Sequence, residues 1–363
     1  MRTAIFLLAG VVLACDAGSS DSEAGAGAGD GADGADGSDG TATGGGACDV
    51  PAGGEVVLPW SEFAASDGLT GPAYGLLTDG ASLFINLYDR IVAVPLAGGS
   101  AVELYRSPKS LPLGLQMWDD ENGIIVYEAG VWSRVPYAGG GGEALTVGLP
   151  NGAAVFDWDR GTDRLLAALD DLAARTTTVY SVTLGHASAL PMVEGASVGY
   201  TRRWVEGGGT LYTQGRMDPE PADHTIYRFV GPDFALPEAL TLTPPPLALV
   251  GADEAAFYYS PDSLDPAVRG LYRVVHGTTT SERVVTSYWS TLTRAHAGTD
   301  GLYVNDASAL WHLPDSGPAV RVASVPATGG CTTHEVLGHE GWLYTVTFRA
   351  ETGENQVWRV RQP

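Results

Sequence analysis

The sequence predicts an all-β chain that folds as a seven-bladed β-propeller, each blade a four-stranded antiparallel sheet. Three observations predict this fold: a strand motif that recurs seven times, glycine-rich turns between the copies, and no convincing amphipathic helix. The 363 residues include 49 Gly and 22 Pro, and 44% are hydrophobic. This composition supplies many turns together with enough apolar residues for a core.

The recurring motif consists of an aliphatic residue, an aromatic one, a variable residue that is often Arg, and a second aliphatic one. Its clearest copies lie at 91–94, 132–135, 179–182, 226–229, 271–274, 310–313 and 357–360. The last residues of the copies are spaced 41, 47, 47, 45, 39 and 47 apart. This period matches the length of a propeller blade, so each copy is predicted to be a blade's third strand.

The remaining strands follow from the segments around each motif. A second strand precedes the motif, at 83–85, 124–126, 165–166, 211–212, 257–258, 302–303 and 343–344. Turns such as Asp79-Gly80, Asn122-Gly123 and Asp300-Gly301 introduce these strands, and such dipeptides tolerate the positive φ of a tight hairpin. Outer strands follow at 102–104, 144–147, 190–193, 239–242, 283–285 and 320–322, and a less regular strand opens each unit.

The seventh unit lacks an outer strand, because the chain stops at Pro363 directly after the third strand. The segment Glu55–Leu58 lies ahead of the first unit and has the character of the missing strand. We expect it to complete the last blade and so protect two sheet edges from aggregation. Six or eight blades remain alternatives, because the third and fourth units are the least regular.

The N-terminus predicts a secreted and tethered protein. Residues 1–14 combine Arg2 with an apolar run too short to span a membrane, as in a signal peptide. Residues 15–47 are mostly Gly, Ala, Ser, Thr and acids, which predicts a flexible tether ahead of a propeller domain at 48–363. The Asp spacing at 30–40 could also suggest calcium, but nothing there fixes a turn that would gather several oxygens on one ion.

Charge narrows the possible partners. The chain has 20 basic and 43 acidic residues, a net charge of −23, and Lys109 is its one lysine. Nucleic acids and anionic membrane surfaces are poor partners for such a chain, because both require Lys/Arg clusters. We expect a monomer.

The three cysteines divide into two predicted roles. If Cys15, at the end of the signal segment, is engaged elsewhere, Cys48 and Cys331 are the one possible intramolecular pair in an oxidising compartment. Closing so long a loop is worth roughly 4–5 kcal/mol by chain-entropy arguments. Cys48 and Cys331 are predicted at opposite ends of the blade, and the residues from Cys48 to Glu55 can span about 23 Å when extended.

Two resemblances bear on these predictions. The segment Val12-Leu13-Ala14-Cys15 resembles the bacterial lipoprotein signal, which implies that Cys15 receives a diacylglyceryl group and becomes the new N-terminus. The resemblance also implies that the protein meets the membrane only through this N-terminal lipid anchor. An ordinary cleaved signal with an incidental cysteine is the alternative. Residues 55–363 resemble bacterial lipoprotein propellers related to the YWTD, NHL and TolB-like families, through the repeat and segments such as Leu211-Tyr212-Thr213-Gln214. The resemblance implies a propeller that serves in the bacterial envelope.

Longer loops predict the face that carries the binding site. The loops at 170–176, 215–224, 260–270 and 349–356 join second to third strands, and loops on a rigid frame often carry binding chemistry. Innermost-strand residues at that channel mouth are the candidate site: Gln116, Asp157, Arg202, Arg203, Arg294, His296, His334 and Glu335. A rim of Arg, His and acids suits an anionic or sugar-like ligand. Alternatively, these polar residues simply fill a water-filled channel.

Three motifs that suggest chemistry fail in context. The segment 195–199 has the GxSxG pattern, but it lies between blades rather than at a strand–turn–helix. The segment 334–339 has one residue too many for HExxH and lies on a strand. The acidic segment 157–163 lacks a calcium ligand and occupies a turn. We assign no catalytic residue, metal ligand or cofactor, and leave calcium as an open alternative.

The predicted function is that of a membrane-tethered, non-enzymatic ligand- or protein-binding scaffold lipoprotein of the bacterial cell envelope. Its partner would be an envelope protein or a small polar or anionic ligand. The alternative is a propeller enzyme, such as a lactonase, lyase or glycan hydrolase, with a site at the channel mouth. That alternative requires carboxylates or histidines that converge with shifted pKa values.

Overall fold

A computed structural model of the whole chain describes most of the predicted propeller domain. The described residues are 48, 50–59, 73, 75–87, 90–107, 116–120, 122–128, 131–151, 153–159, 164–171, 173–184, 188–198, 200–216, 225–230, 237–261, 263, 265–286, 295–298, 300–305, 309–324, 331–349 and 351–363. The chain divides into two compact units, 1–44 and 45–363, and all described residues belong to the second. Cys15, the signal segment and the tether at 15–47 lie outside the described residues.

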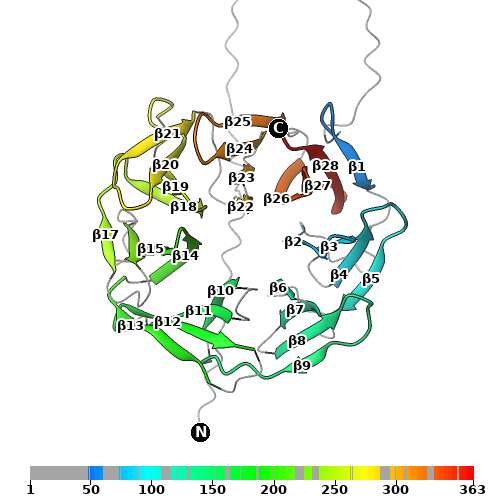
Figure 1. Cartoon of the computed structure of the whole chain (residues 1–363), viewed down its shortest axis with the longest axis horizontal. Coiled ribbons are helices and arrows are strands. Elements are labelled where there is room, and N and C mark those ends of the chain that lie inside the picture. Colours follow the sequence, from blue (N-terminus) through cyan, green and yellow to red (C-terminus); the bar gives the residue numbers. More distant parts are fainter. Residues whose placement is uncertain are drawn as a thin grey trace, which may run out of the picture. The chain divides into compact units, whose positions relative to one another are not determined.

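The second unit contains seven four-stranded antiparallel sheets arranged in a ring (Figure 1). Blade one contains β2 (Gly75–Thr78), β3 (Ser82–Leu87), β4 (Arg90–Pro95) and β5 (Val102–Arg106). Blade two contains β6 (Gln116–Asp120), β7 (Gly123–Glu128), β8 (Val131–Pro136) and β9 (Glu143–Leu145). Blade three contains β10 (Ala154–Asp159), β11 (Arg164–Asp171), β12 (Thr176–Thr183) and β13 (Leu190–Ala196).

The other four blades repeat this order from the inner to the outer strand. Blade four contains β14 (Tyr200–Gly207), β15 (Thr210–Arg216), β16 (Thr225–Val230) and β17 (Glu238–Leu240). Blade five contains β18 (Pro246–Ala252), β19 (Ala256–Pro261), β20 (Leu271–Val275) and β21 (Ser281–Val285). Blade six contains β22 (Ala295–Gly298), β23 (Gly301–Asn305), β24 (Ala309–Pro314) and β25 (Val320–Ser324). Blade seven contains β26 (Cys331–His339), β27 (Trp342–Arg349), β28 (Glu354–Arg361) and β1 (Glu55–Leu58).

The architecture confirms the predicted seven-bladed propeller. Each copy of the motif lies in a third strand: β4, β8, β12, β16, β20, β24 or β28. The N-terminal strand β1 pairs antiparallel with β28 and completes blade seven, as predicted. Among the described residues, no helix is long and apolar enough to cross a membrane.

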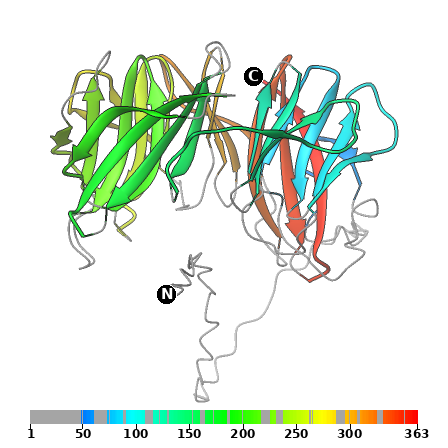
Figure 2. The ribbon, with the colours of Figure 1, turned by 90° about the horizontal axis from the view of Figure 1, so that it is seen from below.

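The strands run between two faces of the ring (Figure 2). We call the face with the first-to-second and third-to-fourth turns the turn face. We call the other one, with the second-to-third connections and the connections between blades, the loop face. The turns of the turn face are short: two residues, 340–341, join β26 to β27, and two, 208–209, join β14 to β15.

Apolar side chains hold neighbouring blades together. Tyr212 of blade four and Phe257 of blade five are almost wholly buried, and their ring centroids are 4.4 Å apart. Similar clusters join blade one to blades two and seven, and blade six to blades five and seven. Aromatic residues of the second strands therefore pack between blades, where ring pairs add specific contacts to apolar burial.

Blade seven is closed by contacts that reach across the sequence. Glu55 of β1 accepts two hydrogen bonds from the Arg359 guanidinium of β28, with N–O distances of 2.9 and 3.1 Å. Cys48 and Cys331 form the predicted disulfide, with their Cα atoms 5.7 Å apart. Residues 48–54 thus lead from the start of β26 at the loop face to the start of β1 at the turn face.

Candidate functional site

The turn face carries a cavity of about 680 Å³ that extends over blades four to seven. Its lining comes from the first-to-second turns and the strand ends beside them: Glu206, Gly207, Ala252, Asp253, Glu254, His296, Ala297, Gly298, Asp300, Gly338, His339, Glu340, Gly341 and Gln362. The volume lies within the range of ligand-binding clefts. We call it the turn-face cavity.

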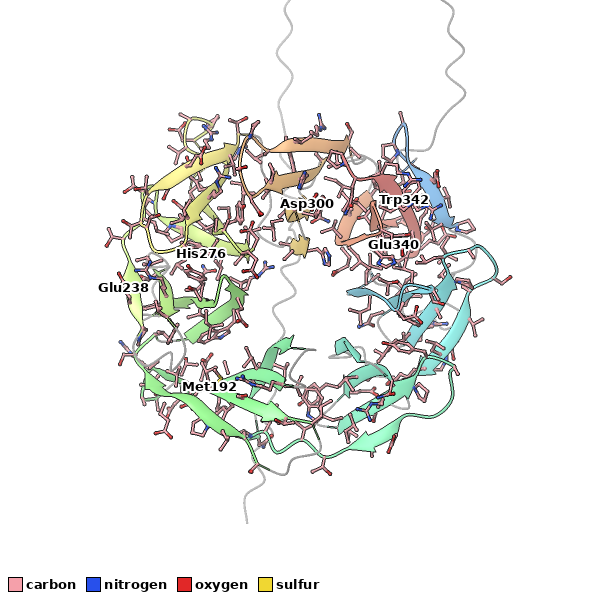
Figure 3. The ribbon with its side chains drawn as sticks, viewed as in Figure 1. Met192, Glu238, His276, Asp300, Glu340 and Trp342 are labelled. Atoms are coloured by element: carbon pink, nitrogen blue, oxygen red, sulfur yellow. A yellow bond between two sulfur atoms is a disulfide. The ribbon has the colours of Figure 1, made fainter. Side chains whose placement is uncertain are left out.

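The lining of this cavity is acidic. Of the described residues that line it, five are Asp or Glu, two are His, and none is Lys or Arg. Asp300 and Glu340 come from neighbouring blades and lie nearer the centre of the ring than Glu238 on outer strand β17 (Figure 3). Carboxylates gathered in a concave surface focus a negative potential, which attracts cations and repels anions.

Asp253 builds the turn of blade five. Its side chain is 4% exposed, and Oδ1 accepts hydrogen bonds of 2.8 Å from the backbone N–H groups of Ala255 and Ala256. The Tyr258 hydroxyl donates to Oδ2 at 2.8 Å. Burial, together with the Asp253 charge, raises the pKa of Tyr258, so this hydroxyl stays protonated and remains a donor. The Asp253 carboxylate is therefore fixed in position.

Blade six repeats the aspartate–tyrosine pair. The Tyr303 hydroxyl donates to both Asp300 oxygens, at 2.9 and 3.0 Å. The His312 ring stacks on Tyr303 with centroids 4.6 Å apart, and its Nε2 lies 3.1 Å from the Asp300 carbonyl oxygen. Burial is the largest cause that raises the pKa of Tyr303, and the Asp300 hydrogen bond adds to it. The Tyr303 hydroxyl thus orients the Asp300 carboxylate, and Asp300 also lines the turn-face cavity.

Glu340 is held in a conformation that non-glycine residues rarely adopt. It has φ 47° and Gly341 has φ 75°, the positive pair typical of a type I′ hairpin turn. Blade four fills the same turn with Gly208 and Gly209, at φ 55° and 67°. A glutamate in the left-handed region costs about 1 kcal/mol relative to its relaxed conformation. Such strain often accompanies a functional side chain.

His296 lies on inner strand β22 and faces blade seven. Burial lowers its pKa, although a hydrogen bond to the backbone of Gly338 opposes that shift. A Cβ placed on Gly338 would lie 3.3 Å from His296 Cδ2, so the glycine permits this close approach between blades. His296 is consequently neutral at neutral pH and adds no positive charge to the acidic cavity.

The predicted rim residues are only partly described. His296 lines the turn-face cavity, whereas Arg203 is half-buried and Glu335 is 7% exposed, and neither lines it. The backbone carbonyl oxygen of Glu335 accepts a 2.5 Å hydrogen bond from Thr345. The remaining candidates lie outside what the structure describes, either as side chains or entirely: Gln116, Asp157, Arg202, His334 and Arg294. The structure therefore leaves the predicted loop-face rim untested.

The cavity lies on the face opposite to the one favoured by loop length. Many of the loop-face connections lie outside the described residues, whereas the short turns gather acids from four adjacent blades. Sequence reasoning treated Asp300 as a turn former and did not single out Asp253, Glu254 or Glu340. An acid recurring at the first-to-second turn of successive units was the available signal.

The motifs rejected on sequence grounds lie on strands and connections. Residues 195–196 end β13, and 331–339 form β26, so neither segment lies on a helix. Within the described ranges, no three His, Cys, Asp or Glu side chains converge where they would hold a metal ion.

Comparisons with known proteins support the propeller fold but do not assign the chain to a family. No protein-family model matches the chain, and no curated protein matches it. Solved structures do match. PorZ of Porphyromonas gingivalis, an essential bacterial surface component of the type-IX secretion system, aligns with a TM-score of 0.50 and 12% identity over 86% of this chain. This chain spans only 39% of that PorZ chain.

Two further structures align equally well. YCF48, solved bound to a D1 peptide, has a TM-score of 0.51 and 8% identity over 82% of this chain and 95% of its own. A puromycin hydrolase variant has a TM-score of 0.51 and 12% identity over 81% of this chain and 54% of its own. At these identities the likeness concerns the propeller fold alone.

Proposed function

We propose that this protein is a lipid-anchored, non-enzymatic binding protein of the bacterial envelope whose turn-face cavity receives a basic segment of a partner protein. The observation that carries the proposal is the acidic lining: the described residues around a cavity of about 680 Å³ include five carboxylates and no Lys or Arg. Attraction to a basic segment follows from this charge, because complementary potentials speed association and select partners.

The same lining bears on the ligand class expected from the sequence. An anionic ligand would meet the carboxylates of Glu206, Glu254 and Glu340, and no Lys or Arg is among the described residues that line the cavity. A basic protein segment replaces that repulsion with attraction. Cys15 and the tether would leave the propeller free to reach such a partner in the periplasm or at the cell surface.

Known propellers support a binding role by analogy. PorZ is a bacterial surface component of a secretion system, and YCF48 was solved with a bound peptide. The puromycin hydrolase in the same comparison is an enzyme, so the fold itself does not decide between the two roles. The acidic cavity is the reason for preferring binding.

Binding is tested with a fluorescein-labelled decapeptide of alternating lysine and glycine. We expect the full chain to bind it, and the triple variant Glu206→Gln, Glu254→Gln, Glu340→Gln to bind about tenfold more weakly in fluorescence anisotropy. The matched control is Glu194→Gln, Glu238→Gln, Glu282→Gln, which removes three exposed carboxylates from outer strands. Equal weakening by the two triple variants would show that net charge alone attracts the peptide, and would refute the site.

The lipid anchor is tested separately, by labelling cells with radioactive palmitate. We expect label in the wild-type chain and none in Cys15→Ser. Equal labelling of the two chains, or no label in either, would remove the anchor from the proposal and leave the cavity untouched.

A further inference from the structure

A second cavity, of about 440 Å³, lies between blades one and two. The outer strand β5 forms one side, and β7, β8 and the turn after β8 form the other. It shares no lining residue with the turn-face cavity. We call it the interblade groove, and its argument does not depend on the proposed function.

The groove contains one buried carboxylate. Glu128 ends strand β7 and is 8% exposed. Its Oε2 accepts a 2.9 Å hydrogen bond from the Tyr105 hydroxyl, and its Oε1 accepts one from the Ser107 hydroxyl. Both donors are neutral and come from blade one, so they orient the carboxylate across the blade boundary without neutralising it.

Among the described residues, the hydrogen bonds to Glu128 come from hydroxyl groups and none comes from an Arg, Lys or His. Arg106 is the one basic residue in the groove lining, and it donates to Glu103 at 3.0 and 2.8 Å. Arg90 Nη1 lies 3.8 Å from the same Glu103 carboxylate, so both arginines pair with Glu103 rather than with Glu128. A buried carboxylate without a counter-charge is costly, and a bound cation would relieve that cost.

The walls indicate what kind of cation fits. Three apolar residues line the groove: Leu104 and Val126 are buried, and Val131 is 51% exposed. Gly140 and Gly141, also in the lining, have open space where a Cβ would lie, so no side chain of their own closes the groove there. Apolar walls around a carboxylate suit a charged head on an aliphatic stem.

We propose that the interblade groove binds a primary alkylammonium group, the chemistry of a lysine side chain or a free aliphatic amine. The ammonium lies against Glu128 and donates to its free lone pairs, while the stem packs against Leu104 and Val126. Burial and the Glu128 hydrogen bond raise the pKa of Tyr105 to about 12, which keeps its hydroxyl protonated and donating to the carboxylate beside the ligand.

The test uses n-butylammonium as the probe, with n-butanol as its uncharged counterpart, and the full chain followed by NMR titration. For a ligand of five heavy atoms we expect a Kd of about 1 mM. Glu128→Gln keeps one acceptor oxygen for a hydroxyl donor, presents its amide N–H to the other hydroxyl and removes the charge, so it should weaken binding about tenfold. Glu282→Gln, an exposed glutamate of blade five, is the control and should leave the affinity unchanged.

Two further arms keep the result interpretable. Val131→Phe alters an exposed position at the groove and should weaken butylammonium binding even if Glu128→Gln fails to fold.

Lys109→Gln removes the one lysine ammonium of the chain. A new or tighter butylammonium site in this variant would mean that Lys109 fills the groove, and would overturn the proposal. Equal affinity for butanol and butylammonium, or unchanged affinity in Glu128→Gln, would also overturn it. Nα-acetyl-lysine methylamide binding as tightly as butylammonium identifies a protein side chain as an acceptable source, whereas its exclusion restricts the groove to free amines.

Discussion

Blade five and blade seven have the same four-stranded layout but take their strands from the chain differently. Blade five is continuous from β18 to β21, whereas blade seven joins β26–β28 to the N-terminal β1. Both place an Arg of the third strand beside a Glu of the outer strand: Arg273 with Glu282 at 2.7 Å and Arg359 with Glu55 at 2.9 Å. Position in the blade, rather than order in the chain, therefore determines which residue is found there.

The two blades differ in how their edges are held. Blade seven has the Cys48–Cys331 disulfide, and Asn355 of β28 accepts a 3.1 Å hydrogen bond from the backbone N–H of Ala73, ahead of blade one. Blade five depends instead on its own Asp253 turn and on Tyr259, whose hydroxyl lies 2.9 Å from Ser281 of β21. A blade made from two chain ends thus uses cross-links of long sequence separation, and a continuous blade uses local ones.

Removing the disulfide should have the largest effect and should act on blade seven. The Cys48→Ser, Cys331→Ser double variant no longer closes a loop with a sequence separation of 283 residues. We expect the free energy of unfolding to fall by up to about 4 kcal/mol in urea denaturation. In hydrogen exchange, β1 and β28 amides should exchange faster while β20 amides stay protected at low denaturant. Uniform loss of protection in the two blades would contradict the comparison.

Replacing Asp253 should destabilise blade five, with the second-largest loss in the free energy of unfolding. Asp253→Ala leaves two backbone N–H groups and the Tyr258 hydroxyl buried without their acceptor, so we expect a loss of about 3 kcal/mol. The matched control is Asp79→Ala, because Asp79 accepts from the N–H groups of Ala81 and Ser82 in an exposed turn. That change should cost about 1 kcal/mol. Equal losses in urea denaturation would show that burial does not distinguish the two turns.

Sequence alone predicts the ring and its closure because both depend on repetition. The motif sets the third strands, and Glu55–Leu58 fills a position that the seventh unit leaves open. The two cavities do not recur from blade to blade, so the repeat in the sequence does not predict them. Asp253 and Glu128 look like ordinary turn and strand residues until folding brings Tyr258 to one and Tyr105 of another blade to the other. Spatial neighbours, rather than residue types, define these sites.

At alkaline pH we expect a smaller difference between the two blades, in how the stability of the protein depends on pH. Burial raises the pKa of Tyr259 in blade five to about 12, whereas blade seven has Thr345 at the corresponding position, which does not ionise in this range. The unfolded tyrosine ionises near its ordinary pKa of about 10, so stability that is fully present below pH 10 is lost as the pH rises towards 12. Tyr259→Phe should reduce the slope of stability against pH there by about one proton. Thr345→Val should leave the slope unchanged, and a slope that is the same in both variants would contradict the assignment.

Glu340 should show the smallest effect on stability and the opposite sign. Blade five forms its first-to-second turn with Asp253, whereas blade seven holds Glu340 at φ 47°. Glu340→Gly relieves that conformation, and we expect a gain of about 1 kcal/mol in urea denaturation. Arg175→Gly is the control, because Arg175 has φ 57° in the turn between β11 and β12, away from the cavity. Both changes should stabilise the protein, but only Glu340→Gly should weaken binding of the lysine–glycine peptide. If both leave peptide binding intact, the strain at Glu340 does not serve the turn-face cavity, and blade seven's turn is simply a less favourable version of that in blade four.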